Sequence, residues 1–401
     1  MEADWKPVLQ LVHVTDLHVK HITANPAHAL TGRGRWLARK AQRLVEKWDV
    51  ANWNEGTQGH FPSAPESFRR FLVEWRRRDP LWRDAPIWLV DTGDRTAFGD
   101  AASLQEGARY LSLWQQALGN CPLRSLYGNH DAWPGTLPLL LPDQIDAQRR
   151  WISATDGWSP VDWLRTPLSV PLPGGQNAIE LFALDSVCRH SLGNTRAIGE
   201  LDPGAVEALV ARMRISSRSG VGGLRILAMH HPLAFPWERH EVRQAGVLAT
   251  MRLKNDERMT AVLRNDSNDP PDFGPLMHLV LSGHTHLSHP ASGLSGDVTS
   301  IHQGGLAPTQ LQLVGGSLML NKSRRAARGS QDSDTVEDRS LADFVPATVN
   351  AVRCQAQILQ FMACAAEPEH LLMLRTPVLS VDGSRYEAGE PDGTKLVMSS
   401  P

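Results

Sequence analysis

Five short apolar runs in the chain each end in a cluster of glycine, aspartate, asparagine or histidine, and this repeated pattern constrains the fold most strongly. The runs cover residues 8–14, 86–91, 123–127, 224–229 and 277–281. Short apolar runs bounded by turn residues are typical of buried β-strands. Segments with helical spacing of apolar residues separate several of the runs. This alternation predicts an α/β fold with mainly parallel strand pairing in the first part of the chain.

The helices are expected over residues 65–78, 101–118 and 202–215. Ser63 precedes the first of them and Glu66 follows three residues later, which predicts a capping box at its start. Asp202 stands where the third helix begins, and its short side-chain carboxylate is suited to an N-cap.

The pattern changes after residue 295, where strands follow one another without long helices between them. These strands are expected over residues 298–302, 311–320, 352–363 and 371–381, as an antiparallel region that completes the sheets. The polar segment 321–340 is expected to be a mobile loop, with docking of a partner as the alternative. We therefore expect one domain over residues 1–388, with its motifs within 8–290, followed by a frayed tail over 389–401.

The clusters that end the five runs carry hard oxygen donors and imidazoles. They are Asp16-Leu17-His18, Gly93-Asp94, Gly128-Asn129-His130-Asp131, His230-His231-Pro232 and Gly283-His284-Thr285-His286. Functional residues of open α/β sheets gather at the carboxyl ends of strands, so these clusters are expected to meet in space. Each alone has an ordinary explanation as a turn, a surface pair or a packed histidine. Together, nitrogen and oxygen donors without thiolates favour manganese, iron or zinc in a hydrolytic site.

Composition narrows the class of protein. The chain has 41 Lys and Arg residues against 43 Asp and Glu, and this balance does not support a nucleic-acid partner, which usually requires a basic excess. Four widely spaced cysteines do not form a disulfide framework. No signal peptide is visible in the first residues, and no apolar run approaches the ~20 residues that span a membrane. We expect a cytoplasmic protein without a membrane span.

The five clusters resemble those of the calcineurin-like metallophosphoesterase family. The family pattern is D-x-H, GD, GNH[D/E], H and GHxH in that order, and all five elements stand here between about residue 8 and residue 290. The resemblance implies a four-layer α/β/β/α sandwich of two mixed sheets flanked by helices. It also implies a dinuclear metal centre at the rim of the sheets.

The resemblance further assigns residues to this centre. One metal ion would be held by Asp16, His18, Asp94 and His286, and the second by Asp94, Asn129, His230 and His284. A bridging role suits Asp94 because a carboxylate has two oxygens with ample lone pairs. His130 would be the catalytic histidine near the leaving group, with Asp131 orienting it. His231 would be structural or would support the ligands.

The resemblance implies hydrolysis of a phosphoester by a hydroxide activated between two metal ions, without a covalent intermediate. The expected substrate is a small phosphorylated molecule, and the intact GNHD cluster favours a phosphodiester, such as a cyclic nucleotide. A phosphomonoesterase, a nuclease and a non-catalytic scaffold are the alternatives. One departure is Ala97, where the family often has a further aspartate. Arg95 is expected to lie on the surface or to form a salt bridge rather than to meet a substrate phosphate.

Overall fold

The computed structural model of the chain describes fifteen stretches of the sequence. They are residues 4–19, 63–96, 101–132, 167–175, 177–187, 199–218, 223–233, 253, 276–284, 298–300, 311–316, 318, 354–367, 370–380 and 384–398. The segment 321–340, His286 and Ala97 lie outside these residues.

The first sheet combines parallel strands from the start of the chain with antiparallel strands from its end. The parallel strands are β1 (Trp5–Val14), β2 (Ile87–Asp91) and β3 (Leu123–Ser125). The antiparallel strands are β10 (Cys354–Cys364), β11 (His370–Ser380), β12 (Glu387–Ala388) and β13 (Asp392–Val397). The strand order is β12-β11-β10-β1-β2-β3, and β13 also pairs with β11.

The second sheet is built from the middle of the chain, in the order β4-β5-β6-β7-β9-β8. Its strands are β4 (Leu168–Pro171), β5 (Ala178–Ala183), β6 (Gly223–Ala228), β7 (Leu279–Ser282), β8 (Val298–Ser300) and β9 (Leu311–Val314). The antiparallel pairing expected for residues 311–320 is confirmed on one side of β9 and wrong on the other, because β9 runs antiparallel to β8 but parallel to β7. The strand ends at Val314, and Leu318 then donates a backbone hydrogen bond to Thr15 of the first sheet.

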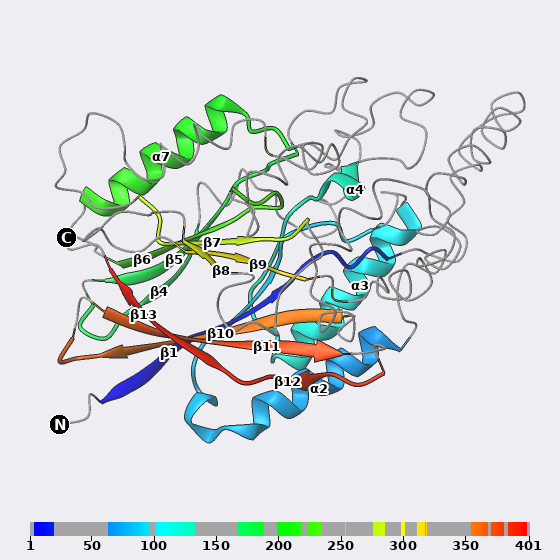
Figure 1. The fold of residues 1–401 in the computed structure, drawn as a ribbon, viewed down its shortest axis with the longest axis horizontal. Helices are drawn as coiled ribbons and strands as arrows, with labels where there is room; N and C mark the ends of the chain where they lie inside the picture. The colour runs from blue at the N-terminus through cyan, green and yellow to red at the C-terminus, as the bar shows by residue number, and fades with distance from the viewer. Residues whose placement is uncertain are drawn as a thin grey trace, which may run out of the picture.

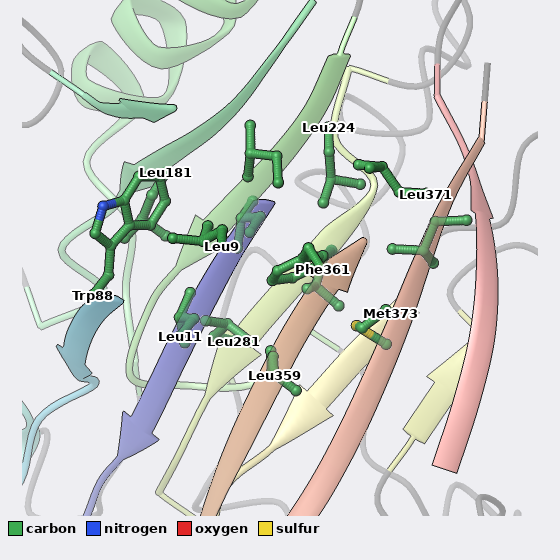
Figure 2. Packing of buried hydrophobic residues seen from close by; sticks show 14 of the residues in the cluster. Leu9, Leu11, Trp88, Leu181, Leu224, Leu281, Leu359, Phe361, Leu371 and Met373 are labelled. Atoms are coloured by element: carbon green, nitrogen blue, oxygen red, sulfur yellow. The ribbon is translucent and has the colours of Figure 1, made fainter. Parts of the chain in front are cut away.

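Three apolar clusters hold four layers together. The inner cluster joins the two sheets, and Figure 2 shows Leu9 and Leu11 of β1 packed with Leu281 of β7. A second cluster packs α2 (Ala64–Arg78) and α3 (Ala101–Ala117) on the first sheet. A third packs α7 (Pro203–Arg218) on the second sheet. The expected α/β sandwich of two mixed sheets flanked by helices is confirmed, and Figure 1 shows α7 and α2 on opposite sides of the strands.

The two expected helix caps have different outcomes. At α7, the side chain of Asp202 accepts a hydrogen bond of 2.9 Å from the backbone of Ala205, as predicted. At α2, Ser63 stands at the N-cap position, but its side chain makes no capping hydrogen bond. Glu66 instead binds Arg69, one turn further along the helix. The capping box is wrong because Ser63 itself has a helical backbone, whereas a capping side chain needs extended backbone.

The expectation of a frayed tail from residue 389 is also wrong. Strand β13 pairs with β11 along six residues, and Leu396 and Met398 are buried in the inner core. The sequence DGTKLVM hides this because its apolar residues are few and only the partner strand defines the register. Cys121 and Cys364 are buried free thiols, as expected. None of the described helices is long and apolar enough to cross a membrane.

Candidate metal centre

The motif loops of both sheets meet through backbone hydrogen bonds at the carboxyl ends of the parallel strands. Asp16 and His18, after β1, donate from their backbone nitrogens to Gly93 and Asp94, after β2, over 2.9 Å each. In the second sheet, the backbone of Gly283 after β7 donates to the carbonyl of His230 after β6. The loops of the first sheet therefore supply Asp16 and Asp94, and those of the second sheet supply His230 and His284.

The motif glycines are required because these loops approach one another at backbone distance. A Cβ on Gly128 would overlap Asp94 Oδ1 and lie 2.6 Å from its Cγ. A Cβ on Gly283 would overlap Thr15 Oγ1 and lie 2.5 Å from Asp16 Oδ2. Only glycine leaves room for the neighbouring carboxylate in both places. The glycines of the GNHD and GH clusters thus allow the contact between motifs.

Strained backbone is concentrated at the candidate ligands. Among the described residues, five that are not glycine have a positive φ, and four of these are Asp16 (53°), His18 (48°), Asp94 (53°) and His284 (71°). The left-handed region is unfavourable for residues with a Cβ and is found mostly where function or tight packing imposes it. The strain therefore marks the same residues that the sequence pattern selects.

Each aspartate uses one carboxylate oxygen to fix the loops and turns the other toward histidines. Asp16 Oδ2 accepts hydrogen bonds from Thr15 Oγ1 (2.7 Å) and from the backbone of His284 (2.9 Å). Asp94 Oδ1 accepts from the backbone of His130 (2.8 Å). Asp94 Oδ2 is buried without a hydrogen-bond partner among the described residues. It lies 3.7 Å from His18 Nε2 and 3.4 Å from His230 Nε2.

His230 is oriented so that its Nε2 atom faces other acceptors. Its Nδ1 lies 2.9 Å from the carbonyl oxygen of Thr92, which only accepts hydrogen bonds, so Nδ1 carries a proton. Its Nε2 lies 3.0 Å from Asn129 Oδ1 and 3.2 Å from His284 Nδ1. Burial lowers the pKa of His230, but the charge of Asp94 and the hydrogen bond to it, the charge of Asp16 and the hydrogen bond to Thr92 together outweigh burial and raise the pKa to about 9. A positive charge is therefore favoured at this point.

The donor set fits metal ions. In the described part of the chain, potential ligand atoms lie within 4.8 Å of one another in three sets: Asp16, Asp94 and His230; His18, Asp94 and His130; and His230, His231 and His284. Buried oxygens and imidazole nitrogens that face one another repel unless a proton or a metal ion lies between them. Nitrogen and oxygen donors suit manganese, iron or zinc. Asp94 belongs to two of the sets, as a bridging carboxylate would.

His130 and Asp131 lie in the short helix α4 (Asn129–Ala132) beside this cluster. The half-buried ring of His130 lies 4.7 Å from that of His18, edge to face. The carboxylate of Asp131 accepts hydrogen bonds from the backbones of Gly128, Arg95 and Thr96 over 2.8–3.1 Å. Burial, and then the charge of Asp94, raises the pKa of Asp131. Its contacts hold two motif loops together, a role that the sequence did not indicate, and its effect on His130 stays a prediction.

Arg95 points away from the cluster, into the protein. Its side chain is 1% exposed, its Nε lies 3.6 Å from Asp91 Oδ2, and it also donates to Ser125. Gly107 of α3 leaves room for its methylene groups. This agrees with a salt-bridge role.

Other supporting residues escaped the sequence analysis because nothing local distinguishes them. Thr15 orients Asp16, the carbonyl of Thr92 orients His230, and Ser186 contacts His231. A hydroxyl beside a motif aspartate is the one signal that was visible for Thr15. Thr92 acts through its backbone and Ser186 comes from a different strand, so neither contact can be read from the chain.

Comparison with known proteins agrees with the pattern of clusters. The model of the calcineurin-like phosphoesterase family matches residues 9–288, and the chain belongs to this family. No curated protein matches the sequence.

Two solved structures resemble the chain more distantly. The purple acid phosphatase from yellow lupin (Lupinus luteus) seeds has a TM-score of 0.44 and 10% identity, covering 97% of this chain and 54% of that one. The sulfate thiohydrolase SoxB of Thermus thermophilus has a TM-score of 0.37 and 12% identity, covering 98% and 57%. The chain spans little more than half the length of either protein.

Proposed function

We propose that the chain is a dinuclear metal-dependent phosphoesterase whose substrate is a small phosphodiester. Family membership supports a metal-dependent phosphoester hydrolase. The observation that carries the proposal is the buried convergence of Asp94 Oδ2, His230 Nε2, Asn129 Oδ1 and His284 Nδ1, within 3.0–3.4 Å of the His230 nitrogen. Such a group of acceptors has little use in a folded protein except to hold a cation.

The ligand sets proposed are those of the family resemblance. Asp16, His18, Asp94 and His286 would hold one ion, and Asp94, Asn129, His230 and His284 the other. When bound, the two ions supply Lewis acidity to the phosphoryl group and an activated water as nucleophile. Manganese, iron and zinc all suit the donors.

The chain's own residues would position the ligands and the leaving group. Thr15 and Thr92 fix the carboxylate of Asp16 and the imidazole of His230. His130 is half-buried beside the cluster, so its ring can reach a substrate while its backbone is held by Asp94. We propose that His130 stabilises or protonates the departing oxygen. Asp131 keeps the loop of His130 against the loop of Asp94.

Preference for a diester is the finer part of the proposal and rests on the intact GNHD cluster. Phosphomonoester and nuclease activities are the alternatives within the same family. A cytoplasmic location also stays a prediction from the cysteine content.

The test is an activity panel with manganese-loaded protein. Aryl phosphodiester, aryl phosphomonoester, cyclic nucleotide and single-stranded DNA are compared for wild type and His130→Ala. We expect diester hydrolysis by wild type and a loss of about 10²-fold or more in kcat for the variant, the scale of general acid–base catalysis. Faster turnover of the monoester or of DNA would contradict the substrate class. Absence of hydrolysis on every substrate would contradict the proposed function.

A further inference from the structure

His231 is buried beside the candidate centre and is held by Ser186. Its backbone nitrogen donates to Ser186 Oγ over 3.1 Å, and its Nδ1 lies 2.9 Å from the same oxygen. Both side chains are fully buried. Ser186 follows β5, so the second sheet anchors His231 from a neighbouring strand. These two contacts fix both the backbone and the ring of His231.

The ring of His231 lies between a glycine and the ring of His284. A Cβ on Gly199 would come within 2.6 Å of His231 Cγ, so the backbone of Gly199 closes one side. On another side, the centroid of the His284 ring lies 4.3 Å away, at an interplanar angle of 50°. His231 therefore has little room to retreat from His284.

His284 and His230 differ in how their rings are oriented. His230 is fixed by the carbonyl of Thr92, as metal-binding histidines commonly are by a partner on the second nitrogen. His284 Nε2, in contrast, is buried without a hydrogen-bond partner among the described residues. Its backbone also has a strained φ of 71°. The His284 ring contacts the rings of both His230 and His231, with centroids 5.0 Å and 4.3 Å away. The nearer ring, that of His231, can therefore set its orientation.

We propose that His231 is a positioning residue for the metal centre: its ring, anchored by Ser186 and backed by Gly199, holds the imidazole of His284 with Nδ1 facing His230 Nε2. The proposal rests on the proposed function and deepens it, because it assigns the second histidine of the HHP cluster. The competing reading makes His231 a metal ligand, since a ring nitrogen lies within 4.8 Å of those of His230 and His284. Its Nδ1 is engaged with Ser186, so binding a metal ion through that atom would break this contact.

Calorimetric titration with Mn²⁺ separates the two readings. We expect His231→Ala to weaken binding of one of the two ions by about tenfold or more, the scale of losing ligand support, and to leave the other ion unchanged. His231→Phe restores a ring without a donor nitrogen but also loses the contact with Ser186, so it should bind the affected ion more tightly than His231→Ala and about as tightly as Ser186→Ala. His230→Ala is the reference for loss of a true ligand. Leu209→Ala, a buried change in α7, controls for general destabilisation.

Ser186→Ala provides a second variant if His231→Ala does not fold. It removes the anchor of the ring and should weaken the same ion in the same direction. The absorption spectrum of Co²⁺-loaded protein should change in both variants, and the change in His231→Phe should be smaller than in His231→Ala, which a purely structural role would not produce.

Several outcomes overturn the proposal. They are unchanged binding of both ions in His231→Ala and Ser186→Ala, loss of an ion in His231→Phe equal to that in His230→Ala, and absence of metal binding by wild type. A wild type that binds two ions but hydrolyses no phosphoester would overturn the proposed function alone, while the titrations still decide the role of His231.

Discussion

At the scale of single residues, the centre depends on close backbone approach as much as on ligand chemistry. Asp94 sits against Gly128, and Asp16 sits against Gly283, at distances that exclude any Cβ. Asp16, His18, Asp94 and His284 adopt left-handed backbone despite their side chains. Strain of about 1–3 kcal/mol at each such residue persists only where the surrounding structure enforces it. Here the enforcing contacts are the hydrogen bonds between motif loops.

Replacement of Gly128 by alanine should therefore damage metal binding more than folding. The new Cβ would overlap Asp94 Oδ1, which moves the carboxylate or separates the loops. We expect metal affinity to fall by at least tenfold in Gly128→Ala, measured by Mn²⁺ titration. Gly393→Ala is the matched control, because its Cβ meets only ordinary contacts at 3.6 Å or more. Equal affinities in the two variants would refute the role given to Gly128.

His13, near the end of β1, gives a prediction on the pH dependence of stability. Burial lowers its pKa to about 3, and its nitrogens bind Thr92 and Gln357. The unfolded chain, where the pKa is about 6.5, takes up a proton that the folded chain refuses. His13 therefore contributes stability above pH 6.5 that is lost as the pH falls toward 3, by about 1.4 kcal/mol per pH unit.

Urea denaturation at pH 7 and pH 5 measures this loss. We expect wild type to lose about 2 kcal/mol more free energy of unfolding than His13→Asn between these pH values. An identical change in both proteins would mean that the pKa of His13 is the same in the folded and the unfolded chain, which would contradict the prediction.

At the scale of elements, each motif occupies the few residues after a strand, and each strand end is fixed by its neighbours. Strand β13 is the element whose importance the sequence conceals. It pairs with β11 from His370 to Arg375 and brings Leu396 into the inner core. The last strand thus belongs to the packing that holds the two sheets together, and through them to the site.

Leu396→Ala should destabilise the whole domain. The side chain is 1% exposed, and removing a buried leucine side chain costs about 2–5 kcal/mol. We expect a drop of that size in the free energy of unfolding, with a lower melting temperature. Glu390→Ala, an exposed change close to β13, should have an effect below about 0.5 kcal/mol. Similar small effects in both variants would contradict a packed β13 and support the expectation that the tail is frayed.

At the scale of the whole molecule, the centre lies where the two sheets meet. Asp94 and Asn129 come from the first sheet, and His230 and His284 come from the second. A bound ion would therefore link the two sheets at the carboxyl ends of their strands, where the inner apolar core does not join them. Metal binding and global stability should be coupled for this reason.

Manganese should raise the melting temperature of wild type, and a chelator should reverse the change. At a free concentration about 100 times the dissociation constant, linkage predicts about 2.7 kcal/mol of added stability per site. In His230→Ala, the increase should be smaller because one site loses a ligand. Equal increases in both proteins would place the bound metal elsewhere in the molecule.

The sequence predicts the alternating strands well because they depend on local patterns, and the ligand roles of the residues at their ends stay a prediction. Apolar runs followed by Asp16, Asp94 or His230 predict buried strands with polar residues at their ends. The sequence-based prediction fails where the structure depends on contacts between residues that are distant in the sequence. Ser63 does not cap α2 although its neighbours suit a cap. The roles of Asp131 and Ser186 depend on loops that only the folded chain brings together. His286 lies outside the described residues, so its part stays a prediction.

The metal content of Asp94→Ala, compared with wild type, tests the central claim most directly. Both proteins are stripped with a chelator, loaded with Mn²⁺, dialysed and measured by elemental analysis, with circular dichroism to show that both are folded. Because Asp94 is proposed to bridge the two ions, we predict two equivalents in wild type and loss of both ions in the variant. Retention of both ions by Asp94→Ala would contradict a centre built around this carboxylate.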